Sequence, residues 1–130
     1  MGTWGHDAFS NDDALDWLGE LLDAGNLGPV EEALTTAASA ETYLDAPDCT
    51  QALAAAEVVA ALRGKPGGGL PKKLVPWLEG RPRPADALLD TARRAVAKVM
   101  QDSELKDLWV ESGHPQAWEE GVRDLQARLL

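Results

Sequence analysis

The chain is 130 residues long, and 45% of its residues are hydrophobic and 26% are charged. This length and composition are typical of one globular domain and exclude a disordered chain. The net charge of −10 argues against a nucleic-acid binder, because the phosphate backbone repels an acidic protein.

A first helix is predicted to begin after Phe9, with Ser10 or Asn11 as its N-cap. Trp17 borders its apolar stripe, acidic residues take the opposite side, and Gly25 ends the helix. The residues of the stripe recur at the spacing of one helix face: Ala14, Leu15, Leu18, Leu21 and Leu22.

Two more helices are predicted in the first half of the chain. Pro29, at a first helical position, starts a helix that runs to about residue 40. Residues 45–47 are expected to form a turn, and Asp48 to cap a third helix over 49–62. This third helix is almost wholly apolar and rich in small residues, so we expect it to be central and packed on several sides.

The second half of the chain is predicted to open with a glycine-rich loop over 64–71 and a short helical turn that Pro76 interrupts. Three helices follow: one that starts at Pro84, one over 104–112 with Leu105, Leu108 and Trp109 inward, and one over 115–130. The connectors are short. The expected fold is therefore all-α, a single domain over 1–130 with six or seven helices packed around the helix at 49–62.

The cellular compartment is indicated by features that the sequence lacks. Cys49 is the single cysteine, so no internal disulfide can form and a reducing compartment fits best. The N-terminus has neither the basic region nor the apolar run of a signal peptide. The longest apolar run, 52–56, is far too short to span a bilayer. We therefore expect a cytoplasmic protein without a membrane-spanning segment.

Blocks of residues along most of the chain carry a family resemblance. They are the opening Met1-Gly2-Thr3-Trp4-Gly5 with Phe9 and Asn11-Asp12, the stretch 54–61, the pair Leu108-Trp109, and the closing residues 118–129. Together they resemble a bacterial family known only as domain-of-unknown-function family 4259. The resemblance implies a domain of that kind over nearly the whole chain, and it implies no activity.

The most distinctive candidate binding residues lie near the N-terminus. Trp4, flanked by glycines, and His6, Asn11 and Asp12 have the side chains to form the rim of a binding pocket. The favoured interpretation is structural: Trp4 and Phe9 fill the core with large aromatic area, and Asn11 caps a helix.

Glu57 is another candidate, because it is the single charge in the apolar run 52–62. If it is buried it needs a partner, such as an arginine or an indole N–H. If it is not, it lies with Thr50 and Ala54 on a face that meets solvent. Both alternatives are open from the sequence.

No catalytic set, metal site or cofactor site is predicted. Asp12, Asp16 and Glu20 gather on the first helix, but they lack the alternate spacing of a calcium loop and the Glu-x-x-His pairs of a di-metal bundle. A solvated acidic face is the favoured interpretation. The two histidines and Cys49 match no zinc-binding spacing. We therefore expect a protein that is not an enzyme and holds neither a metal nor a cofactor.

The charge is divided unevenly along the chain. Residues 1–62 contain 12 acidic and no basic side chains, whereas residues 63–130 contain 10 acidic and 12 basic ones. Six of those basic residues lie in the segment 63–83. The favoured interpretation is that this basic segment folds back over the acidic half. The other is that the acidic half faces a basic partner.

The function expected from the sequence is a non-enzymatic acidic module that binds another protein, as an immunity protein or antitoxin does. A basic protein is the expected partner, with no role for nucleic acid or membrane. The alternative is a metal-dependent hydrolase or metal-binding protein that uses the acidic first helix, through Asp12, Asp13, Asp16, Glu20 and His6.

Overall fold

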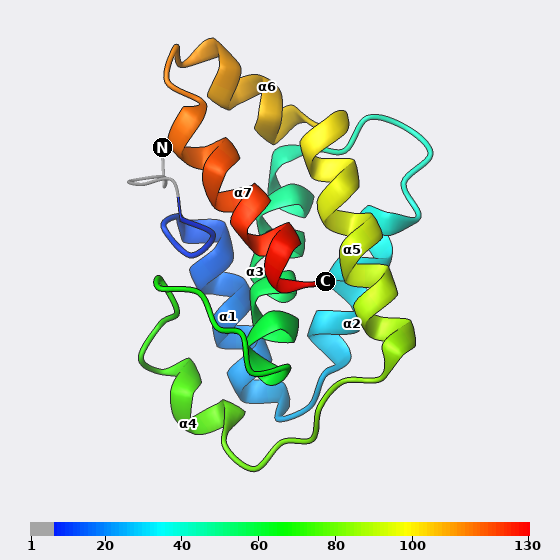
Figure 1. Ribbon diagram of the computed structural model, residues 1–130, viewed down its shortest axis with the longest axis vertical. Helices are drawn as coiled ribbons and strands as arrows, with labels where there is room; N and C mark the ends of the chain where they lie inside the picture. Colours follow the sequence, from blue (N-terminus) through cyan, green and yellow to red (C-terminus); the bar gives the residue numbers. More distant parts are fainter. Residues whose placement is uncertain (1–6) are drawn as a thin grey trace.

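The architecture is known from a computed structural model, which describes residues 7–130 (Figure 1). In this range the chain forms seven α-helices and no strand, which confirms the all-α prediction. The helices are α1 (Asp12–Ala24), α2 (Gly28–Ala38), α3 (Ala46–Leu62), α4 (Leu74–Leu78), α5 (Asp86–Gln101), α6 (Glu104–Glu111) and α7 (Gln116–Arg128). None of the helices described is both long and apolar enough to cross a membrane.

Helix α3 lies at the centre of the fold, as predicted. It contacts α1, α2, α5, α6 and α7, and Figure 1 shows it running behind α7 through the middle of the molecule. Ten of its residues are buried: Cys49, Thr50, Ala52, Leu53, Ala54, Ala55, Ala56, Val58, Val59 and Ala60. Because most of these side chains are small, the neighbouring helices approach the α3 backbone closely on several sides.

Helix α1 begins and ends where the sequence predicted, and Ala14, Leu18 and Leu21 of the predicted stripe are buried, but the buried face is centred closer to Trp17 than predicted. The Asn11 side chain accepts a hydrogen bond from the Ala14 N–H, and Gly25 ends the helix with a φ of 69°. Trp17 is only 3% exposed, whereas Leu15 is 40% exposed. The prediction that Leu15 belongs to the stripe and Trp17 to its border is wrong. The buried set follows the spacing i, i+3, i+4 and i+7, which places the large indole in the core: Ala14, Trp17, Leu18 and Leu21.

Helix α3 starts three residues earlier than predicted. Asp45, not Asp48, is its N-cap, and the Asp45 side chain accepts a hydrogen bond from the Asp48 N–H at 3.1 Å. Pro47 lies in the first turn, where a helix leaves its N–H groups without internal partners and therefore tolerates proline. The predicted turn at 45–47 is thus the start of the helix. A carboxylate oxygen of Glu104, from α6, accepts a further hydrogen bond from the Ala46 N–H at 2.7 Å.

Helix α6 packs through only part of the predicted face. Leu108 is 50% exposed, so the prediction that it points inward is wrong. Leu105 and Trp109 are partly buried against the core. The Trp109 ring stacks on Trp118 of α7, with ring centroids 6.5 Å apart and an interplanar angle of 11°. A helix of eight residues has too few turns to bury a full stripe, and the aromatic stack holds it in place.

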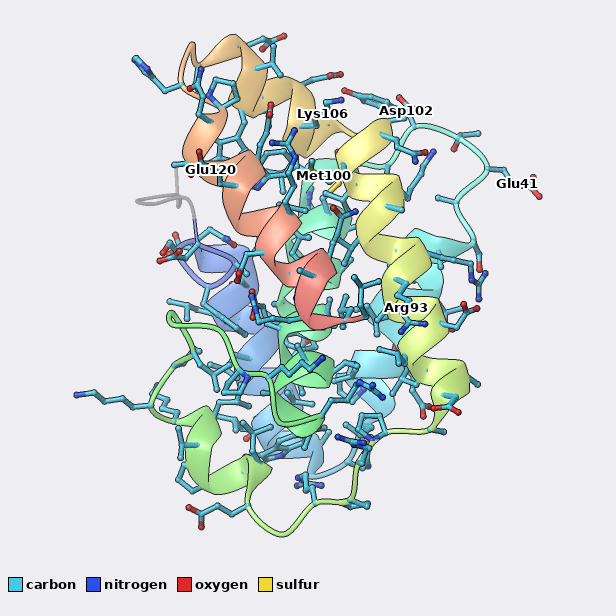
Figure 2. The ribbon with its side chains drawn as sticks, in the orientation of Figure 1. Glu41, Arg93, Met100, Asp102, Lys106 and Glu120 are labelled. Carbon is cyan, nitrogen blue, oxygen red and sulfur yellow. The ribbon has the colours of Figure 1, made fainter. Side chains whose placement is uncertain are left out.

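The end of the chain is fixed by a contact from α5. Figure 2 shows Arg93 of α5 beside the last turn of α7. Its Nε donates to the Leu129 carbonyl at 2.7 Å, and its Nη2 donates to the Leu130 carbonyl at 3.2 Å. These carbonyls lie at the C-terminus of a helix, where a cation is stabilised by the helix dipole. α7 therefore docks on the same core as α3 and α5.

Candidate functional site

The residues singled out from the sequence do not form one site. Trp4 and His6 lie outside the described residues. Asn11 is 9% exposed, and both ends of its side-chain amide are occupied. Its oxygen accepts from the Ala14 N–H at 2.8 Å and its nitrogen donates to the Ala8 carbonyl at 3.3 Å. Asn11 is therefore a capping residue, as the favoured interpretation predicted.

The remaining candidates on α1 form a surface that we call the acidic face. It consists of five carboxylates, all of them exposed: Asp12, Asp13, Asp16, Glu20 and Asp23. Within residues 7–130, no basic side-chain nitrogen lies within 4.0 Å of any of these carboxylates, so none of them forms an ion pair there. The face therefore presents uncompensated negative charge to the solvent.

The basic segment 63–83 makes contacts of another kind. Arg81 donates from Nε to the Trp77 carbonyl at 2.6 Å and from Nη1 to the Gly25 carbonyl at 3.3 Å. Its guanidinium carbon lies 3.6 Å from the centroid of the Trp77 ring, a cation–π contact. Arg83 donates to the Arg63 carbonyl at 3.1 Å. The segment thus touches the end of α1. It therefore contacts the first half of the chain, as the favoured interpretation predicted. Within the described residues, however, no basic side chain of the segment forms an ion pair with a carboxylate of the acidic face.

Glu57 is half-buried and paired with an arginine, so the structure follows the paired one of the two alternatives left open by the sequence. Arg128 of α7 donates from Nη1 and Nη2 to the two carboxylate oxygens of Glu57, at 2.8 and 3.0 Å. The side chains are 14% and 15% exposed. Arg128 also donates from Nε to Asp124 at 2.8 Å. The hydrogen bond with Glu57 raises the pKa of Arg128 against the opposing effect of burial.

A glycine loop closes over this ion pair. A Cβ atom added to Gly67 would lie 2.8 Å from a carboxylate oxygen of Glu57, so the loop approaches at a distance that only glycine permits. The Lys65 carbonyl accepts a hydrogen bond from Arg128 at 3.3 Å. A cavity of about 100 Å³ adjoins the pair, lined by the loop, by residues 7–9 and by side chains of α3 and α7. It is small beside the roughly 300 Å³ or more of typical ligand pockets. The pair therefore ties α3, α7 and the loop together.

Cys49 is the residue with the strongest intrinsic nucleophile, and its surroundings suppress that reactivity. It is 0% exposed, and its Sγ donates to the Leu44 carbonyl at 3.7 Å. Burial raises the pKa of the thiol, although hydrogen bonds with Ser103 and the Leu105 backbone partly oppose this. A protonated, enclosed thiol is a poor nucleophile. Over residues 7–130, no three His, Cys, Asp or Glu side chains gather as metal ligands would.

Sequence reasoning missed the partners of Glu57. Arg128 and Asp124 show the i, i+4 spacing of a helical ion pair, and this signal is visible in the sequence. The link from Arg128 to Glu57 spans 71 positions and has no local signal. The three consecutive glycines at 67–69 indicated a loop, but not the close approach that requires Gly67.

The comparisons with known proteins give one match. A family model described as "Domain of unknown function (DUF4259)" matches residues 2–121, a range that includes α1 to α6 and the start of α7. This confirms the resemblance inferred from the sequence blocks. No curated protein and no solved structure matches the chain.

Proposed function

The chain belongs to this family of unknown function, and we propose that it is a non-enzymatic acidic module that binds a basic region of another protein in the cytoplasm. The acidic face of α1 carries the proposal, because its five carboxylates are exposed and unpaired throughout the described structure. An immunity protein or antitoxin that masks a basic surface is the class of module that fits this arrangement.

The helix dipole favours Asp12 and Asp13 in the first turn, but the spacing of the carboxylates along the rest of α1 costs the helix stability. Asp12 and Asp16 are four residues apart, as are Asp16 and Glu20. Like charges at this spacing destabilise a helix by about 0.2–0.5 kcal/mol for each pair. A cationic surface docked on α1 would remove this repulsion, and the negative field would speed the encounter with such a surface.

The acidic face is also held rigidly, which favours binding. Trp17, Leu18 and Leu21 anchor the opposite face of α1 in the core. The helix is capped at both ends, by Asn11 and by Gly25. Because the helix is ordered before a partner arrives, little conformational entropy is lost when the partner docks.

Recovery of the partner tests this proposal. The tagged full-length chain is expressed in the cells it comes from, and bound proteins are identified by mass spectrometry. The test variant is Asp13→Lys/Asp16→Lys/Asp23→Lys, which reverses charge along one stripe of α1. We expect wild type to recover a protein with a basic surface that the variant loses.

The matched control changes the total charge by the same amount at other sites. Glu41 precedes α3, Glu111 ends α6 and Glu120 lies on α7, and all three are exposed. Figure 2 labels Glu41 and Glu120. The variant Glu41→Lys/Glu111→Lys/Glu120→Lys should keep the partner. Equal loss in both triple variants would mean that net charge, and not the acidic face, determines binding. A partner that both variants retain would overturn the proposal.

A further inference from the structure

A polar pocket lies where α1, α2 and the first turns of α3 meet. Its volume is about 180 Å³, and its walls include Trp17 and Glu20 of α1, Thr36 of α2, and Gln51 of α3. A cavity of about 150 Å³ holds a molecule the size of benzene. The pocket therefore has room for the planar end of one side chain and not for a nucleotide. It lies apart from the Glu57–Arg128 pair, with which it shares no lining residue.

The charged groups of the pocket are all acidic. Glu20, Glu32 and Asp48 line it, one from each of the three helices, and no lysine, arginine or histidine does. None of these three carboxylates forms an ion pair within residues 7–130. Burial, and then the neighbouring Asp45 carboxylate, raise the pKa of Asp48. A cation in the pocket would relieve this unfavourable charge.

Trp17 provides a second, independent polar group. Trp17 is only 3% exposed, and it forms part of the pocket wall. Within the described residues, the indole N–H of Trp17 has no hydrogen-bond acceptor. Two other side-chain nitrogens there, Arg63 Nε and Trp77 Nε1, are fully enclosed and also lack a partner. The Trp17 nitrogen is not among those sealed atoms, so it meets solvent. Trp17 lines the pocket, and its N–H is the hydrogen-bond donor that this side chain can offer to an acceptor there.

We propose that this pocket receives an arginine side chain of the protein partner, with the guanidinium among Glu20, Glu32 and Asp48 and a partner carbonyl on the Trp17 indole N–H. The inference rests on the proposed function and names the residue that the partner inserts. Arginine fits because its five donors match several carboxylates at once and its planar, weakly hydrated group stacks well on an indole. The hydroxyl of Thr36 and the amide of Gln51 line the same space and supply further hydrogen-bonding groups.

The test uses a defined probe and the full-length protein. N-acetyl-arginine methylamide carries both the guanidinium and the peptide carbonyls, and the citrulline analogue has the same shape without the charge. Binding is followed in proton–nitrogen NMR spectra at the indole N–H of Trp17. The variant Trp17→Phe identifies that signal among those of the five tryptophans.

The arginine probe should shift the Trp17 signal in a saturable way, and the citrulline probe should not. Glu32→Gln/Asp48→Asn should weaken arginine binding by about tenfold or more, since it removes two charge-assisted contacts. The control Glu111→Gln/Glu120→Gln removes two exposed charges from α6 and α7, outside the pocket, and should change binding by less than about twofold. If the double pocket variant does not fold, Glu32→Gln alone, at an exposed position, should still weaken binding by about threefold.

The pocket assignment is overturned if the Trp17 signal does not respond to arginine, if citrulline binds equally, or if the control weakens binding as much as the pocket variant. The proposed function can fail separately. If partner binding depends on Asp13, Asp16 and Asp23 but the Trp17 signal does not respond to arginine, only the arginine site is overturned. If arginine shifts the Trp17 signal but partner binding does not depend on those three residues, the arginine site is supported and docking through the acidic face is overturned.

Discussion

Glu57 and Arg128 join the central helix to the last helix through two hydrogen bonds, of 2.8 and 3.0 Å. Their side chains are 14% and 15% exposed, so solvent screens the charges only partly. The pair formed by Asp90 and Arg94 on α5 is 64% and 59% exposed. The two pairs have the same chemistry and different surroundings, which makes the second a control for the first.

The variant Glu57→Gln keeps the size of the side chain and removes its charge. Arg128 would keep Asp124 but lose its two-point contact in a mostly enclosed site. We expect the free energy of unfolding to fall by about 2 kcal/mol, since a hydrogen bond to a charged group contributes about 1.5–3 kcal/mol. Urea denaturation measures this change. Asp90→Asn should cost less than about 0.5 kcal/mol. Equal costs at the two sites would show that enclosure gives the Glu57 contact no special role.

Tyr43 gives a second prediction at the scale of single residues, because it is the only tyrosine. Its hydroxyl donates to an Asp107 carboxylate at 2.5 Å, and this hydrogen bond, first among the causes, raises the pKa of Tyr43 to about 12. The folded state therefore holds the proton more tightly than the unfolded state. The contact stabilises the fold below pH 10 and is lost between about 10 and 12.

The ultraviolet absorbance of tyrosinate should thus give a midpoint near 12 in the folded protein. In Asp107→Asn the midpoint should move toward 10, the value of a free tyrosine. Circular dichroism recorded at each pH shows whether the fold persists through the titration. A wild-type midpoint at 10 in folded protein would mean that the hydrogen bond with Asp107 does not form.

Among the elements, the loop over 64–71 depends most on a single residue type. Gly67 faces the oxygen of Glu57 at a distance that leaves no room for a Cβ, whereas a Cβ at Gly68 would have nothing within 4 Å. The two glycines are adjacent, so they form a matched pair. What distinguishes them is the Glu57–Arg128 pair beneath the loop.

Gly67→Ala should force the loop away from the ion pair. Because Glu57 is held by two hydrogen bonds, its carboxylate cannot easily move aside, and we expect a loss of about 1 kcal/mol with faster proteolysis near residue 67. Gly68→Ala should be neutral or stabilise the protein by up to about 1 kcal/mol, because alanine restricts the unfolded chain. Limited proteolysis and thermal unfolding compare the variants. If the two variants behave identically, the close approach of the loop to Glu57 does not contribute to stability.

Local signals in the sequence predicted the elements well, and contacts between distant residues less well. The Asn11 cap, the Gly25 end and the apolar run of α3 depend on neighbouring residues, and each was predicted correctly. Which face of α1 is buried depends on what packs against it, so Leu15 and Trp17 were exchanged. The Glu57–Arg128 pair joins two helices that are far apart in the sequence, and the pocket at Trp17 is lined by three helices, so helix periodicity could not locate them.

At the scale of the whole molecule, the five exposed carboxylates of α1 have no ion-pair partner within residues 7–130. The arginines of 63–83 bind carbonyls and a tryptophan ring in the described residues, and they leave the carboxylates of α1 open to solvent. A folded domain whose charges face outward in this way attracts cationic surfaces over a distance of about 8–10 Å at physiological salt. We therefore propose that α1 steers and docks a basic partner.

The salt dependence of the association rate with the recovered partner tests this claim most directly. Stopped-flow or surface-based kinetics would be recorded from low to high ionic strength for wild type, for the α1 variant Asp13→Lys/Asp16→Lys/Asp23→Lys, and for the control Glu41→Lys/Glu111→Lys/Glu120→Lys. Wild type should associate at least about tenfold faster at low salt than at high salt, because steering comes from the field of the protein. The α1 variant should associate slowly with a nearly flat salt dependence, and the control should stay closer to wild type. A steep salt dependence that survives charge reversal on α1 would contradict the claim.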